Sequence, residues 1–78
     1  MNERDILDDH LHDQLRLAEL RLLEAEELVA KQLRVICELE ASGHDTTAAR
    51  ELLATCETNV RLQEGERERL RRGLANLE

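Results

Sequence analysis

Apolar residues recur at alternating intervals of three and four positions along most of this chain, and proline is absent. On an α-helix this spacing gathers them into one narrow stripe, the seam that a coiled coil buries. We call the two such stretches the seams, and their residues are Leu11, Leu15, Ala18, Leu22, Ala25, Val29, Gln32, Ile36 and Leu39, then Ala49, Leu53, Cys56, Val60, Gln63, Arg67, Leu70, Leu74 and Leu77. The pattern predicts two long helices, and the lack of any aromatic residue removes the largest contributors to another kind of core.

The sequence Ser-Gly-His-Asp-Thr-Thr at 42–47 is the one interruption of this pattern. Gly43 suits the left-handed residue that follows a helix end. Asp45 can accept hydrogen bonds from the first N–H groups of the next helix, and Thr46 or Thr47 could do so instead. We therefore expect one all-α domain of 78 residues, an antiparallel helical hairpin with a helix over about 3–42, a turn over about 43–45 and a helix over about 46–77.

A second set of apolar residues lies beside the seams, at heptad positions c and g. Leu17, Leu28 and Val35 belong to this set in the first helix, and Leu52 and Leu62 in the second. The g positions of an antiparallel pair come to the same side, which we call the c/g flank. A continuous apolar face of this kind usually marks an interface, so we expect a homodimer that forms a four-helix bundle. The alternative is a monomeric hairpin with ordinary exposed leucines.

The second seam becomes polar toward the C-terminus, where Gln63, Gly65 and Arg67 follow one another closely. Glycine inside a helix costs about 1 kcal/mol relative to alanine. Two interpretations remain open: a loosely packed C-terminal half, or a polar layer that fixes register or contacts a partner.

No residue pattern supports catalysis or the binding of a cofactor, and we assign no catalytic, cofactor or metal residue. The acidic, histidine-containing segment near the N-terminus resembles a metal site, but His10 and His12 would lie about 200° apart on a helix. Asp8 with His12, or Asp9 with His12 and Asp13, keep a usable spacing. Solvated polar residues at a helix start explain the segment better, because negative charge there suits the helix dipole.

The overall charge and hydropathy exclude several classes of partner. A formal net charge of -7 and the lack of aromatic residues argue against nucleic acid. No apolar run approaches the ~20 residues that span a bilayer. Because Met1–Asp13 is acidic and polar, we expect no signal peptide and a cytoplasmic location. Cys37 and Cys56 lie at different distances from the turn, so we expect no disulfide between them within one chain.

The stretch Leu39–Thr55, LEASGHDTTAARELLAT, is similar to a region of short, uncharacterised bacterial proteins, often proteobacterial, with a Gly-His-Asp-Thr turn before a Leu-Leu helix. In that pattern an aromatic residue commonly stands at the position of Cys56, and histidines at those of Gln63 and Glu66. The resemblance implies a helical hairpin and no particular activity.

These observations favour a non-enzymatic protein-interaction or structural module, a homodimeric hairpin whose faces bind another protein. The alternative is a ligand- or metal-responsive helical bundle that uses the acidic, histidine-containing N-terminus or the arginine-rich C-terminus. Arg67, Arg69, Arg71 and Arg72 form that C-terminal cluster.

Overall fold

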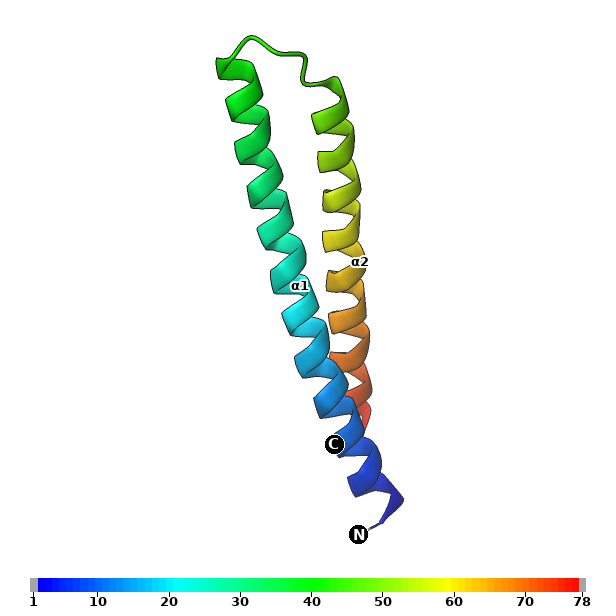
Figure 1. The fold of residues 1–78 in the computed structure, drawn as a ribbon. Helices are drawn as coiled ribbons and strands as arrows, with labels where there is room; N and C mark the ends of the chain where they lie inside the picture. The colour runs from blue at the N-terminus through cyan, green and yellow to red at the C-terminus, as the bar shows by residue number, and fades with distance from the viewer. Residues whose placement is uncertain (1, 78) are drawn as a thin grey trace.

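The computed structural model describes residues 2–77 and contains two long α-helices and no strand over that range (Figure 1). The first, α1, runs over Glu3–Ala41, and the second, α2, over Thr47–Leu77. They lie side by side and antiparallel in a rod of 62 × 14 × 14 Å. The prediction of an all-α helical hairpin is confirmed.

The two seams meet along the length of the rod. Every seam residue is buried or half-buried, and the buried ones are Ala18, Leu22, Ala25, Ile36, Leu70 and Leu74. The small side chains of Ala18 and Ala25 allow the helices to approach closely. The predicted seams are therefore the surfaces that hold the hairpin together, mainly by removing apolar area from water.

Contacts near both ends of the rod define how the helices are aligned. Near the turn, Gln32 Nε2 donates a 2.8 Å hydrogen bond to the carbonyl oxygen of Ala49. Near the termini, a Cβ added to Gly73 would lie 3.8 Å from Cδ1 of Leu11. The polar Gln32 in the first seam is thus satisfied by the α2 backbone, and the glycine at 73 leaves room for a leucine of α1.

The C-terminus of α1 closes with a Schellman motif centred on Gly43. The N–H of Gly43 donates to the carbonyl of Glu40 at 3.1 Å, and the N–H of His44 to that of Leu39 at 2.9 Å. Gly43 has a φ of 73°, the left-handed conformation that this motif requires and that glycine adopts without steric cost. The role expected for Gly43 is confirmed, and His44 contributes its backbone N–H to the same motif.

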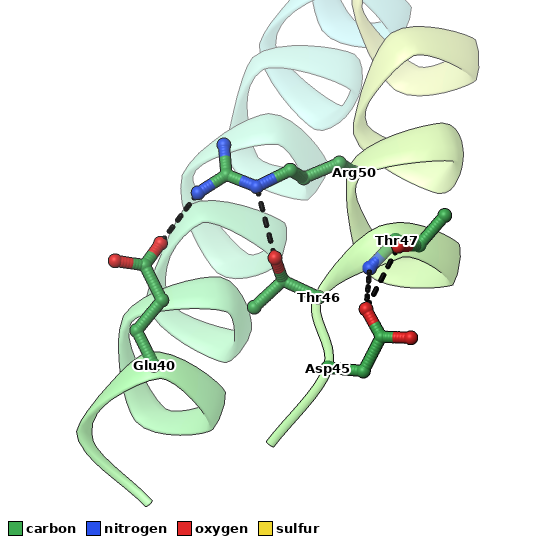
Figure 2. Close-up of polar contacts among 5 residues, drawn as sticks. All are labelled: Glu40, Asp45, Thr46, Thr47 and Arg50. Carbon is green, nitrogen blue, oxygen red and sulfur yellow. Dashed lines mark hydrogen bonds and ion pairs between the residues drawn. The ribbon is translucent and has the colours of Figure 1, made fainter. Parts of the chain in front are cut away.

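The N-terminus of α2 is organised by Asp45 (Figure 2). Its Oδ1 accepts hydrogen bonds from the N–H of Thr47 at 3.0 Å and from Thr47 Oγ1 at 2.7 Å, which lowers the pKa of the Asp45 carboxyl. Arg50 donates to Thr46 Oγ1 at 3.0 Å and pairs with Glu40 of α1 at 2.6 Å. The connection spans 42–46 and is longer than the expected 43–45. Ser42 is the C-cap of α1, and Thr46, whose carbonyl accepts the N–H of Arg50, precedes the first residue of α2.

The hydrophobic core of the hairpin is small relative to its accessible surface. Its accessible surface is 5834 Å², whereas a compact protein of this mass exposes about 4,900 Å². Among residues 2–77, no large side chain is less than 2% exposed. The isolated rod thus leaves about 1,000 Å² more surface in water than a compact fold would.

The helix α2 continues without a break through Gly65, which is exposed and has no atom within 4 Å of the position where a Cβ would stand. The three residues that weaken the second seam thus remain helical. We expect Gly65→Ala to stabilise the protein by about 0.5–1 kcal/mol, since it removes backbone entropy without a clash. Urea denaturation followed by circular dichroism measures the change.

Gly43→Ala is the matched control, because its positive φ makes a side chain costly there: about 1 kcal/mol of destabilisation is expected. Equal effects of the two substitutions would contradict the roles assigned to these glycines.

Amide hydrogen exchange should be faster over 63–67 than over 53–60. Gln63 and Arg67 supply no apolar side chain to the seam, and Gly65 lies between them, whereas Leu53, Cys56 and Val60 are half-buried in it. Mass spectrometry of overlapping peptides measures the difference. Equal protection in the two segments would mean that polar contacts or a second chain compensate.

Candidate interaction surface

The five residues expected at an interface are all exposed on the single chain. Leu17 is 38% exposed, Leu28 52%, Val35 36%, Leu52 52% and Leu62 66%. These side chains are large and apolar, so their exposure to water is unfavourable in free energy. The hairpin itself therefore covers none of these side chains fully.

Arg21 and Glu66 show that the c/g flanks of α1 and α2 lie on the same side of the rod. Both occupy g positions, and they belong to different helices. Hydrogen bonds from Arg69, at 2.6 and 3.0 Å, are the main cause of the lowered pKa of Glu66, and the charge of Arg21 adds to it. The charge of Arg21 is the smallest of these influences, and within residues 2–77 it forms no ion pair with Glu66.

The same alignment places the apolar residues of the flank beside one another. Val35 lies two heptads from Arg21 in the direction of the turn, and Leu52 lies two heptads from Glu66 in the same direction. By this count, these two residues fall at about the same level of the rod. Leu28 lies one heptad from Arg21, at the level of Asn59 and within one turn of Leu62. The flank thus carries exposed apolar residues interspersed with charged ones.

The formal charge differs between the two flanks of the hairpin. Along the c/g flank, from Leu17 of α1 to the turn and back to Arg69 of α2, three basic and three acidic residues balance: Arg21, Lys31 and Arg69 against Glu24, Glu38 and Glu66. Over the same stretch, the opposite flank, at positions b and e, has two basic and six acidic residues: Arg50 and Arg61 against Glu19, Glu26, Glu40, Glu57, Glu64 and Glu68. The excess negative charge therefore lies mainly away from the c/g flank.

Three further exposed leucines of α1 lie outside the c/g flank and were not singled out from the sequence. Leu20 is at position f, Leu23 at b and Leu33 at e. They do not continue onto α2 as the c/g residues do, because its b and e positions hold only alanine, threonine and charged residues. The width of the apolar surface on α1 was the available signal for them.

Arg67 reaches from the second seam toward a surface hollow on the b/e side. The hollow, of about 380 Å³, is lined by both helices: Glu19, Leu20, Leu22, Leu23, Glu26, Arg67 and Arg71. Within residues 2–77, the buried Nε of Arg67 has no hydrogen-bond partner. A seam position is thus occupied by a charged side chain, and one N–H donor of that side chain has no hydrogen-bond partner among the described residues.

The N-terminal segment of α1 extends past the end of α2 (Figure 1). Ile6 and Leu7 there are 56% and 46% exposed. In the same segment His12 Nε2 lies 3.6 Å from Asp8 Oδ1. Over residues 2–77, no three His, Cys, Asp or Glu side chains are arranged to hold a metal ion.

Two of the four arginines in the C-terminal cluster pair with glutamates of their own helix. Arg69 forms hydrogen bonds with Glu66, which raise the pKa of its guanidinium, and Arg72 lies 4.0 Å from Glu68. These contacts reduce the positive charge that an anion would meet there. Cys37 is exposed, Cys56 is half-buried in the seam, and both are free thiols.

Within the described residues, neither helix has the length and apolar character to cross a bilayer.

In comparisons with known proteins, no family model, no curated protein and no solved structure matches the chain.

The unsatisfied donor of Arg67 gives a stability prediction. Arg67→Met keeps a long, flexible side chain in the seam and removes a buried unpaired N–H, which costs about 1–3 kcal/mol. We expect the variant to be more stable by about 1 kcal/mol in urea denaturation. Arg71→Met, at an exposed position beside the same hollow, should change stability by less than about 0.5 kcal/mol. A less stable Arg67→Met protein would show that the guanidinium makes a favourable contact.

Proposed function

We propose that the chain is a non-enzymatic protein-interaction module that acts as a homodimer, in which two hairpins associate through their c/g flanks to form a four-helix bundle. The observation that carries the proposal is the c/g flank itself, where apolar side chains of both helices are exposed and where, between Leu17 and Arg69, formal charges balance. A second copy supplies an identical face of the same length and chemistry. The remaining surface of such a bundle is the acidic b/e side, which is available to other proteins.

The surface area of the rod supports this proposal. A standard interface buries about 800 Å² on each partner. That is comparable with the roughly 1,000 Å² by which the rod exceeds a compact protein of its mass. Dimerisation through the c/g flank would bring the surface of each chain close to that of an ordinary folded protein.

The energetics favour an association of moderate strength. Burying the remaining half of a leucine or valine side chain contributes about 1 kcal/mol, so five residues from each of two protomers give about 10 kcal/mol. Association costs about 4–15 kcal/mol in lost freedom. At the low end of that cost about 6 kcal/mol remains, which corresponds to a weak dimer with a dissociation constant of tens of micromolar. The net charge of -7 opposes it only weakly, because charge on the distant flank is screened beyond about 8 Å.

Leu28→Glu should convert the dimer to a monomer, because it places one carboxylate from each chain in the middle of the apolar face. Size-exclusion chromatography with light scattering should give about 18 kDa for the wild type, twice the chain mass of 9.0 kDa, and about 9 kDa for the variant. Leu33→Glu is the matched control: a similarly exposed leucine of α1 on the other flank, whose substitution should leave the dimer intact. Circular dichroism shows whether each variant is folded.

A wild-type mass near 9 kDa at tens of micromolar would overturn the dimer. If the dimer survived Leu28→Glu combined with Val35→Glu, its interface would lie elsewhere, and the exposed N-terminal residues Ile6 and Leu7 would be the next candidates.

A further inference from the structure

We infer that the b/e side of the hairpin binds an α-helix of another protein, and that the contact face of this helix carries a lysine or arginine seven positions from an apolar residue. The inference rests on the proposed role as a protein-interaction module and names the class of partner. It uses the flank that the proposed dimer leaves free. It is carried by two adjoining surface hollows of different chemistry along the b/e side.

The first of these, which we call the valine hollow, combines two half-buried valines with exposed glutamates. It has a volume of about 290 Å³ and is lined by both helices: Glu26, Val29, Glu57, Val60, Arg61 and Glu64. Three glutamates against one arginine leave a formal excess of two negative charges. Within residues 2–77, none of the three glutamates takes part in an ion pair, and Arg61 donates instead to Thr58 Oγ1 at 3.1 Å.

This combination fits a basic side chain of a partner. Lysine and arginine pack their aliphatic stems on apolar surface while the charged end stays close to water. Val29 and Val60 would contact the stem, and the glutamates would meet the charge. A carboxylate in the same place would add to the excess negative charge. The next charged groups toward the turn, Glu40 and Arg50, pair with each other and leave that excess unchanged.

The second hollow is the one beside Arg67, and we call it the leucine hollow. Two glutamates and two arginines line it, so its formal charges balance. Leu20 and Leu23, also in its lining, are 50% and 54% exposed. An apolar side chain placed there would remove leucine surface from water without meeting an excess of either charge. Glu26 lines both hollows, which are therefore adjoining parts of one groove between the helices.

The spacing of the hollows fits a helix. Val60 lines one and Arg67 the other, and seven residues of α2 correspond to about 10 Å along its axis. Side chains seven residues apart recur on one face of a helix at the same interval. An extended segment would place side chains of one face about 7 or 13 Å apart. The lining residues extend over 57–71 of α2, about 20 Å, which accommodates about four helical turns.

A synthetic helical peptide provides the probe. It is an alanine-rich peptide of about 20 residues with lysine, leucine and lysine at successive seven-residue intervals on one face and glutamine on the others. Fluorescence anisotropy of the labelled peptide measures its binding to the wild-type protein. We expect binding at least tenfold tighter than that of the same peptide with glutamate in place of each lysine. Equal binding of the two peptides, or no binding of the lysine peptide, would overturn the inference.

Charge reversal in the valine hollow tests where the peptide binds. Glu26→Lys combined with Glu57→Lys should weaken binding of the lysine peptide about tenfold. Glu27→Lys combined with Glu51→Lys is the matched control, because it makes the same change in net charge at exposed f positions of the same two helices. The control should change affinity by less than about threefold, and circular dichroism shows that both proteins are folded. Equal weakening by the two pairs would mean general attraction to an acidic protein and would contradict a specific groove.

A second pair of variants separates this surface from the dimer interface. Leu23→Glu, in the leucine hollow, should weaken peptide binding about fivefold and leave the mass measured by light scattering unchanged. Leu62→Glu, on the c/g flank, should weaken the dimer and leave peptide binding unchanged. If Leu23→Glu dissociated the dimer, a second copy of this chain would occupy the groove, and the inferred partner would be wrong. A wild-type monomer that binds the peptide would overturn the dimer alone, whereas a dimer that does not bind it would overturn this inference alone.

Discussion

Two helices can cover only one stripe of each other, and this geometric limit governs the rest of the molecule. The seam removes a single line of side chains from water, so the core contains few buried residues and no large one that is fully enclosed within the described chain. Whatever apolar surface lies beside the seam stays exposed. The hairpin therefore keeps large apolar side chains on its surface, and these are the groups that a second chain could cover.

The polar residues of the seams show how the hairpin tolerates interruptions. Gln32 directs its amide to a backbone carbonyl of the opposite helix and is satisfied. Arg67 keeps its Nε buried without a partner among the described residues. Gln32 and Arg67 differ in length and charge. The short neutral amide of Gln32 can find a hydrogen-bond partner inside the seam. The charged end of the Arg67 guanidinium must extend to the surface, and its Nε then stays in the buried part of the side chain. Both residues reduce the apolar content of the seam, and both make a shifted alignment of the helices less favourable.

The fold could be predicted from sequence because each of its determinants is local. Heptad spacing specified the seams, and Gly43 with Asp45 specified the turn, since a left-handed glycine and an Asx turn depend on adjacent residues. The five residues of the expected interface were chosen from the same spacing, and all five are exposed on the single chain. What spacing could not supply was the alignment between the helices. The hydrogen bond from Gln32 to Ala49 and the unpaired Nε of Arg67 depend on that alignment, which only three-dimensional contacts define.

The single short connection also has a consequence for how the chain reaches this structure. Residues near Ile36 and Ala49 are separated by little sequence, so their meeting costs little chain entropy, whereas Leu11 and Leu74 must be brought together across almost the whole chain. The hydrogen bonds of Gly43, His44 and Asp45 lie at the point from which the helices can zip together. Substitutions beside the turn would then change mainly the rate of folding. Those near the free end would change mainly the rate of unfolding, and that end would open first under thermal motion.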